Sequence, residues 1–164
     1  MIRIRVGTGY DVHRLAEGET LWLGGVLIPH NKGTVAHSDG DVLIHAICDA
    51  LLGALRLGDI GVHFPDSSPE YKNIDSKILL ARSYDLVKQQ HFSIQNIDTT
   101  LCTQKPKLQP FIPEMEKTIA EVLNIDVGQV SVKATTTEKL GYIGREEGIS
   151  AYAVVLVQQD ETGF

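Results

Sequence analysis

The chain has 164 residues, of which 43% are hydrophobic and 22% are charged, and its formal net charge is −6. This composition is typical of a soluble globular protein, and the length predicts one domain over residues 1–164 that buries its core without disulfides. The acidic balance argues against nucleic-acid binding, which needs clustered Lys and Arg. No apolar run approaches the roughly 18 residues of a membrane span, so we expect no membrane partner.

The two cysteines, Cys48 and Cys102, have neither CxxC spacing nor the number needed for a disulfide framework. We expect free thiols in a reducing compartment. The N-terminal residues alternate like a strand and lack the apolar region of a secretory signal. Together these features predict a cytoplasmic protein.

The first third of the chain predicts two strands, a loop and a helix. Residues 2–8 alternate as in a strand, and a strand over residues 21–28 is interrupted by two glycines. Residues 30–38 have the pattern of a loop. The helix over residues 39–57 has apolar side chains around most of its circumference, so it should be buried on more than one side. We expect Ser38 or Asp39 as its N-cap and Gly58 as its C-terminal stop.

The rest of the chain continues the alternation of helices and strands. The expected elements are a long polar loop over 59–73, an amphipathic helix over 75–90, a strand within 92–103, a helix over 113–124, a strand over 130–134, a glycine-punctuated loop to 148, and a strand over 149–157. The last strand is apolar on both faces, which favours a central position. This order predicts an α/β (α+β) sandwich, with one mixed, mainly antiparallel sheet and helices on one face.

Three residues could bind a metal ion together. Asp11 and His13 are two positions apart in extended chain, so their side chains point the same way. His45 lies on the early turns of the apolar helix, where an imidazole is out of place. One carboxylate and two imidazoles with a fourth position open are typical of a catalytic zinc site. The alternative is a buried histidine that is satisfied by hydrogen bonds alone.

Two further segments have the chemistry of an anion site. His37 and Ser38 precede the apolar helix, where backbone N–H groups attract anions; a plain N-cap explains this segment except for His37. In residues 133–139, hydroxyls and two lysines suit phosphate oxygens, and Glu138 is a hard ligand for Mg²⁺ shared with phosphates. The alternative there is a β-branched strand end with surface charges. Prolines stiffen residues 104–110, which could hold a flat base or simply connect two elements.

Taken together, four groups of residues resemble one known family, the 2-C-methyl-D-erythritol 2,4-cyclodiphosphate synthases of the non-mevalonate isoprenoid pathway. The resemblance extends from about residue 3 to about residue 157. The matching residues are Gly9-Tyr10-Asp11-Val12-His13, Ala36-His37-Ser38-Asp39-Gly40-Asp41 with His45, Leu57-Gly58-Asp59-Ile60-Gly61 with Phe64-Pro65-Asp66, and Lys133 to Glu138 with Gly141 and Gly144-Arg145.

The resemblance implies a phosphorus–oxygen lyase that converts 4-diphosphocytidyl-2-C-methyl-D-erythritol 2-phosphate to the 2,4-cyclodiphosphate plus CMP. The 2-phosphate is already a nucleophile, so positioning and charge neutralisation are enough. By resemblance, Asp11, His13 and His45 bind Zn²⁺, one ion per subunit. Glu138 binds Mg²⁺ or Mn²⁺ together with the substrate diphosphate, and His37 and Thr136 are catalytic groups that steady the transition state.

The resemblance also implies the substrate contacts. Residues 59–61 would contact the ribose, 64–68 the methylerythritol, 103–109 the cytosine and 135–138 the phosphates. The full implied set is Asp11, Val12, His13, His37, Ser38, Asp59, Ile60, Gly61, Phe64, Pro65, Asp66, Ser67, Ser68, Thr103, Gln104, Lys105, Pro106, Lys107, Leu108, Gln109, Thr135, Thr136, Thr137, Glu138, Tyr142 and Arg145. Thr103 is larger than the alanine expected there, and Gln109 replaces an apolar residue.

The resemblance further implies a chorismate-mutase-like fold that assembles as a homotrimer. In such a trimer each active site is shared between two subunits. Some members hold an isoprenoid diphosphate in the trimer cavity, where Tyr142 and Arg145 would lie; the alternative for Arg145 is an ion pair with Glu146 or Glu147. Two rival functions stay open: a zinc-dependent phosphodiesterase, in which metal-bound water attacks, and a non-catalytic cytidine-nucleotide-binding module.

Overall fold

The computed structural model describes residues 3–65 and 67–160. Its main sheet has five strands in the order β4-β1-β7-β5-β6, all antiparallel except the β5–β6 pair. The bounds are β1 (Ile4–Glu17), β4 (Lys32–Val35), β5 (Phe92–Cys102), β6 (Val130–Thr135) and β7 (Gly148–Gln159). The predicted mixed, mainly antiparallel sheet is confirmed, and so is the central position of the last strand.

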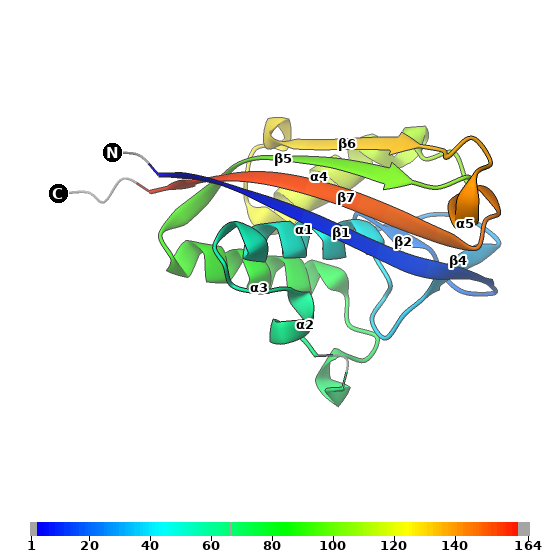
Figure 1. Ribbon diagram of the computed structural model, residues 1–164, viewed down its shortest axis with the longest axis horizontal. Helices are drawn as coiled ribbons and strands as arrows, with labels where there is room; N and C mark the ends of the chain where they lie inside the picture. Colours follow the sequence, from blue (N-terminus) through cyan, green and yellow to red (C-terminus); the bar gives the residue numbers. More distant parts are fainter. Residues whose placement is uncertain (1–2, 66, 161–164) are drawn as a thin grey trace.

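Helices cover one side of this sheet (Figure 1). They are α1 (Val42–Ala54), α3 (Ser76–Gln89) and α4 (Ile112–Leu123). α1 packs on β1 and β7, and α3 packs on α1, so α1 is covered on both sides as its apolar circumference predicted. Between residues 3 and 160, with Asp66 left aside, no helix is long and apolar enough to cross a membrane.

Two glycines allow β1 and α1 to touch through their backbones. A Cβ atom on Gly7 would lie 1.8 Å from the carbonyl oxygen of Ala50, and a Cβ atom on Gly9 would lie 1.9 Å from that of Ala46. Any side chain there would have to displace the helix. This close approach puts the next residues of β1 on that face, Asp11 and His13, beside the N-terminal turns of α1.

The structure corrects several boundaries near the N-terminus. β1 extends well beyond residue 8, so Asp11 and His13 lie within the strand rather than after it. Residues 21–28 form a separate hairpin, β2 (Trp22–Leu23) with β3 (Val26–Leu27), because the glycine pair makes the turn. The expected loop over 30–38 contains β4, which pairs with the C-terminal half of β1.

The start and end of α1 also differ from the prediction. Its N-cap is Asp41, whose side chain accepts from Ile44 N, not Ser38 or Asp39. The helix ends before Gly58, because Arg56 already adopts a left-handed backbone. The cap of α3 is Asp75, whose side chain accepts from Lys77 N.

Short helical turns occupy the expected loops. They are α2 (Ile60–His63) and η1 (Pro69–Tyr71) within residues 59–73, η2 (Gln109–Phe111) before α4, η3 (Val127–Gln129) before β6, and α5 (Gly141–Gly144) before β7. The prediction of continuous loop over 59–73 and from 135 to 148 was therefore wrong. Local capping explains α2, since the Asp59 side chain accepts from Val62 N.

The face of the sheet away from the helices carries exposed apolar side chains. Val6 on β1 is 61% exposed and Tyr152 on β7 is 51% exposed, and Ile4, Tyr10 and Val154 share this face. The apolar side of the N-terminal alternation thus faces outward, while the core side of β1 carries the two glycines. We call this the outer face.

Candidate active site

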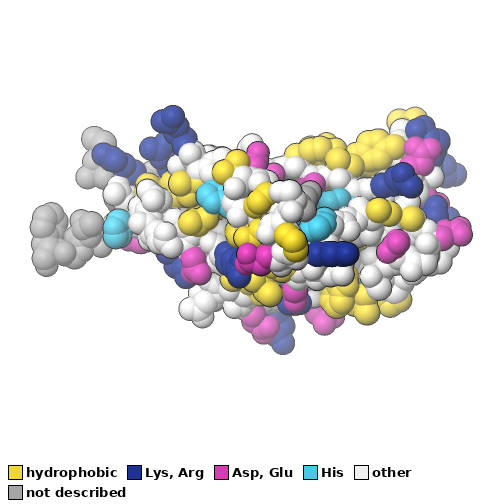
Figure 2. All heavy atoms as spheres, turned by 90° about the horizontal axis from the view of Figure 1, so that it is seen from below, with side chains coloured by type: hydrophobic (Ala, Val, Ile, Leu, Met, Phe, Trp, Pro, Cys, Tyr) yellow, Lys and Arg dark blue, Asp and Glu magenta, His cyan; other side chains and the backbone are white. Residues whose placement is uncertain are grey.

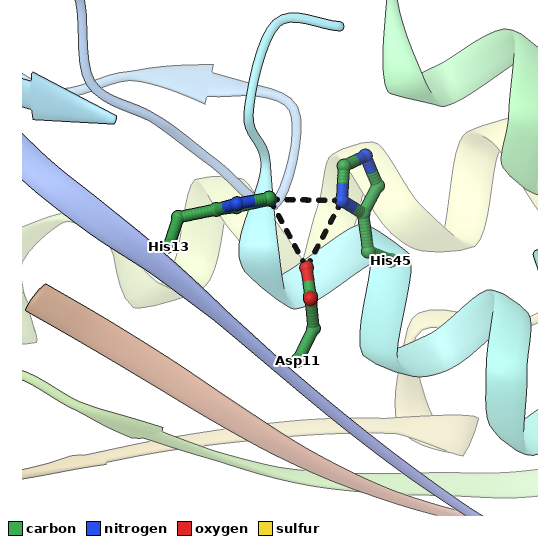
Figure 3. Close-up of side chains that lie close together, drawn as sticks. All are labelled: Asp11, His13 and His45. Atoms are coloured by element: carbon green, nitrogen blue, oxygen red, sulfur yellow. Dashed lines mark hydrogen bonds and ion pairs between the residues drawn. The ribbon is translucent and has the colours of Figure 1, made fainter. Parts of the chain in front are cut away.

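Three side chains converge where β1 meets α1 (Figure 3). Asp11 Oδ2 lies 3.1 Å from His13 Nε2 and 3.0 Å from His45 Nδ1, and the two nitrogens lie 3.1 Å apart. The strand supplies Asp11 and His13 from one face, and α1 supplies His45 from its first turns. The structure therefore brings the three predicted metal ligands together.

The triangle fits a tetrahedral metal ion. Bonds of about 2.05 Å place the ligand atoms of tetrahedral zinc about 3.3 Å apart, close to the separations here. Burial opposes ionisation of Asp11, but hydrogen bonding to His13 and His45 outweighs it and holds the pKa of Asp11 below its ordinary value. Burial likewise disfavours charge on His45, yet Asp11 raises the pKa of that imidazole. The site favours a positive charge between these groups.

A pocket of about 170 Å³ opens beside this triangle. His37 and Ser38 line it, and His37 Nε2 is buried with no hydrogen-bond partner among residues 3–65 and 67–160. The opposite wall is apolar and comes from α2, the loop after it and α3: Ile60, Phe64, Tyr71, Ile74 and Leu79. The pocket thus places a charged triangle and an unsatisfied imidazole nitrogen opposite a hydrocarbon wall.

The residues expected to contact the sugar and methylerythritol lie around α2. Ile60 and Gly61 line the pocket with Phe64, whereas Asp59 is exposed and caps α2. Pro65, Ser67 and Ser68 lie further along the loop, outside the residues that line this pocket, and Asp66 falls outside the described residues.

Sequence reasoning missed Asp49 as an anchor of this segment. Its Oδ1 accepts from Ile60 N at 2.8 Å and so holds the start of α2 against α1. A carboxylate one helical turn after His45 was the available signal, since positions four apart share a helix face.

A second pocket, of about 480 Å³, lies between the 103–109 loop and the end of β6. Thr103, Gln104 and Pro106 to Gln109 line one side, and Val132 to Thr136 line the other. Lys105 is outside the lining and pairs with Glu146 at 3.1 Å. The two pockets share no lining residue, so one chain holds the two predicted halves of the site apart.

The turn after β6 is held by its own side chains. Thr137 Oγ1 donates to Leu140 O at 2.7 Å, and Gln104 Oε1 accepts from Lys139 N at 3.2 Å. Glu138 and Lys139 both have a left-handed backbone. Glu138 is exposed on this turn, outside the lining of the second pocket, while Thr135 and Thr136 belong to it.

Three other residues that were predicted to contact the substrate are not among the residues that line either pocket. Val12 is exposed and, by strand alternation, points away from Asp11 and His13. Tyr142 is on α5, and its hydroxyl lies 3.1 Å from that of Tyr10; this hydrogen bond raises the pKa of Tyr10 to about 12. Arg145 pairs with Glu147, with Nε 2.9 Å from Oε1, which is the alternative that the sequence left open.

Charge does not concentrate on the face that is seen from below, where acidic and basic side chains are interspersed among histidines and apolar groups (Figure 2). An anionic ligand would therefore be held by groups inside the pockets rather than by a field over this whole face.

Comparisons with known proteins agree along nearly the whole chain. The model of the YgbB family matches residues 4–158. A Bacteroides fragilis protein named 2-C-methyl-D-erythritol 2,4-cyclodiphosphate synthase is 59% identical over 158 residues, which cover 96% of this chain and 99% of the relative. A Porphyromonas gingivalis protein of the same name is 62% identical over 153 residues, 93% of this chain and 94% of the relative.

Solved structures give the same result. The bifunctional IspDF of Campylobacter jejuni superposes with a TM-score of 0.94 at 45% identity, over 97% of this chain but only 43% of that longer protein. The CDP complex of Plasmodium falciparum IspF superposes with a TM-score of 0.85 at 40% identity, over 96% of this chain and 97% of that chain. The chain described here belongs to the YgbB family.

Proposed function

We propose that this chain is a cyclase of the non-mevalonate isoprenoid pathway. It converts 4-diphosphocytidyl-2-C-methyl-D-erythritol 2-phosphate to 2-C-methyl-D-erythritol 2,4-cyclodiphosphate and CMP, and residues 1–164 act as one catalytic domain. The observation that carries the proposal is the Asp11–His13–His45 triangle beside the unsatisfied His37, in a chain about 60% identical over its length to relatives of that name.

In this reaction the protein has to position the substrate phosphates, but it does not have to supply a nucleophile. An oxygen of the 2-phosphate bonds to the β-phosphorus, and the bond from that phosphorus to the oxygen bridging it to the α-phosphorus breaks. The electron pair leaves with CMP, so no water and no external proton is consumed. Such transfers are accelerated mainly by alignment and charge stabilisation.

The two divalent cations would supply that charge stabilisation by polarising the phosphate oxygens. Asp11, His13 and His45 would hold Zn²⁺, and Glu138 would hold Mg²⁺ or Mn²⁺. His37 Nε2, which has no hydrogen-bond partner in the described part of the chain, could donate to a phosphate oxygen. The Thr136 hydroxyl would do the same from the other pocket, which that residue lines.

The larger pocket would hold the cytidine. Support comes from its stiff 103–109 rim and from a structural relative that was solved as a CDP complex. The enlarged Thr103 is compatible with this role, because its Oγ1 is turned into the loop and donates to Lys105 O at 2.7 Å. If backbone groups of the loop recognise the base, the side chain at position 109 is not needed for that contact. Gln109 would then be tolerated in place of an apolar residue.

We also propose a homotrimer in which each active site joins the two pockets from neighbouring chains. The apolar outer face is available for burial between subunits, and the two pockets stay separate within one chain. Closed rings create such composite sites. Tyr142 lies at the outer face and could contact an isoprenoid diphosphate in the trimer cavity, whereas Arg145 would first have to leave Glu147. Both cysteines are free and buried, which supports a cytoplasmic location.

Mixing two inactive variants tests the shared site. His45→Ala removes the metal half, and deletion of residues 107–109 removes the base half. After dissociation and reassembly together, the mixture should regain part of the activity, because some interfaces then join two intact halves. Subunit exchange is followed by native mass spectrometry; full exchange without activity would contradict a site built across the interface.

The activity itself is tested by phosphorus NMR on the purified protein with the proposed substrate, Zn²⁺ and Mg²⁺. We expect cyclic diphosphate and CMP from the wild type, neither from His45→Ala, and a rate for Glu138→Gln that falls most at limiting Mg²⁺ and partly recovers with excess. An opened hydrolysis product would instead identify a phosphodiesterase. Nucleotide binding without turnover would identify a binding module.

A further inference from the structure

A short helical segment forms one wall of the pocket beside the metal triangle. Ile60 and Gly61 of α2 and the following Phe64 line this pocket, and we call these three residues the α2 wall. α2 lies at the edge of the helix layer, away from the sheet (Figure 1). None of residues 60–63, all within the described part of the chain, is buried, and Val62 is 68% exposed. Side-chain packing of α2 itself therefore holds this wall only weakly.

The space behind the α2 wall is only partly filled. A further pocket of about 330 Å³ lies between the end of α2 and α3. Its lining consists of His63, Phe64, Arg82, Asp85, Leu86 and Gln89. Phe64 thus borders a pocket on each side, one facing the metal triangle and one facing α3. A segment with so few buried contacts can shift unless polar contacts hold it in place.

Among the described residues, side-chain hydrogen bonds hold α2 at both ends. At its start, Asp49 Oδ1 accepts from Ile60 N at 2.8 Å. At its end, His63 Nε2 lies 2.7 Å from Leu57 O, and the ring nitrogen donates because a carbonyl oxygen only accepts. Both bonds are partly buried, so water competes for them less than at an open surface. The first bond ties α2 to α1, and the second ties the end of α2 to the turn before it.

Asp49 also determines where the α2 wall lies relative to the metal triangle. It follows His45 by four residues on α1, so both side chains share one helix face, about 6 Å apart along the axis. One helix therefore carries a predicted metal ligand and also the carboxylate that anchors the opposite wall. A displacement of α1 would move both groups together, which keeps the width of the pocket constant.

We propose that Asp49 and His63 are positioning residues that hold the α2 wall at a fixed distance from the metal triangle, and that this distance determines how well the methylerythritol end of the substrate is bound. The inference rests on the proposed function, in which this wall faces the ribose and the methylerythritol. Neither side chain is among the described residues that line the pocket, so both act through Ile60 and Phe64. Loss of either bond should weaken substrate binding more than it slows the chemical step.

The experiment removes each hydrogen bond and then restores it. Asp49→Ala and His63→Leu each abolish one bond. Asp49→Asn keeps an oxygen that can accept from Ile60 N, and His63→Gln keeps an N–H that can donate to Leu57 O. Val62→Ala is the matched control, because Val62 belongs to α2 but is exposed and makes neither bond.

Three quantities are measured on each full chain. Hydroxyl-radical footprinting reports the exposure of Phe64, which is 8% exposed in the structure, and Phe92 on β5, which is 7% exposed, is the internal reference for an intact fold. Zinc content after reconstitution reports the metal site. Steady-state kinetics with the proposed substrate separates KM from kcat.

We expect Asp49→Ala and His63→Leu to increase the oxidation of Phe64 while Phe92 stays protected and the zinc content stays full. KM should rise about 3- to 10-fold, the factor that corresponds to the net contribution of one hydrogen bond, and kcat should change less. Asp49→Asn, His63→Gln and Val62→Ala should behave like the wild type.

Unchanged oxidation of Phe64 in both Asp49→Ala and His63→Leu would overturn the inference, and so would an equal increase in Val62→Ala. Increased oxidation with an unchanged KM would also overturn it, because the position of the wall would then not determine substrate binding. A wild type that binds zinc but forms no cyclic diphosphate would overturn the proposed function and the role in substrate binding. Footprinting would in that case still decide whether the two residues hold the α2 wall.

Discussion

Gly9 holds the two halves of the metal triangle together, and Gly9→Ala should separate them. The added Cβ would lie 1.9 Å from Ala46 O, where an ordinary contact is 3.4 Å or more. The obstacle is helix backbone rather than a movable side chain, so β1 and α1 would have to part by about 1.5 Å to restore van der Waals contact. Asp11 is two residues along the strand on the same face, and His45 is the neighbour of Ala46.

This displacement exceeds what a metal site tolerates. Ligand distances have to stay within about 0.2 Å of their preferred values, so a shift of this size should cost most of the zinc affinity. Overpacking against backbone should also destabilise the fold by about 3 kcal/mol or more. For a chain of this length, that corresponds to a fall of roughly 6–12 °C in melting temperature.

A second glycine provides the matched control. Gly53 lies on α1 itself, and a Cβ there would meet only Thr8 O, at 3.8 Å. Gly53→Ala should therefore stabilise the protein by about 0.5–1 kcal/mol through better helix propensity. Thermal unfolding in a chelator reports the fold, and zinc content after reconstitution reports the site. A Gly9→Ala protein with wild-type melting temperature and full zinc content would refute the reasoning.

Two further predictions concern groups outside the site. Burial raises the pKa of the Cys48 thiol to about 12, so this thiol should not react with a thiol reagent at neutral pH in the native protein. Peptide mapping should find Cys48 unmodified in the native protein and modified in denaturant. Labelling of Cys48 in the native protein would contradict its burial. On the edge of the sheet, hydrogen bonding to Lys133 lowers the pKa of Asp98, so Asp98→Asn should cost on the order of 0.5 kcal/mol at neutral pH, after allowance for solvent screening. A lowered pKa stabilises the fold above the unfolded value and the contribution is lost as pH falls through the folded value. Urea unfolding of both proteins should therefore converge in strong acid, and a difference that grows there would contradict the ion pair.

Much of this protein followed from local sequence pattern. The spacing of Asp11 and His13 places both on one face of any strand, whatever that strand pairs with. The apolar circumference of α1 required cover on two sides. The run at 149–157, apolar on both faces, favoured a central strand, and β7 lies between β1 and β5 although Tyr152 and Val154 remain exposed on its outer face. The fold class was predictable for these reasons. His45 stood out locally only as an imidazole on an apolar helix, and the family resemblance was needed to join it to Asp11 and His13.

The cap of α1 shows where local pattern fails. Ser38, Asp39 and Asp41 are all good capping residues, and nothing nearby in sequence distinguishes them. The choice is made by the β2–β3 hairpin, whose Gly24 and Gly25 N–H groups both donate to the Asp41 carboxylate. The Asp39 carboxylate instead accepts a hydrogen bond from the hydroxyl of Ser76, which lies 37 residues further along the chain.

The faces of β1 depended on tertiary structure in the same way. Alternation determined that Ile4 and Val6 share one side, but not whether that side meets the helices. α1 approaches so closely that only Gly7 and Gly9 fit between the backbones, which turns the apolar side chains outward. Side-chain periodicity is a property of neighbouring residues, so the sequence by itself determines which residues share a face. Tertiary packing decides which segment covers that face. It also decides which carboxylate accepts a hydrogen bond from an N–H group that is distant in sequence.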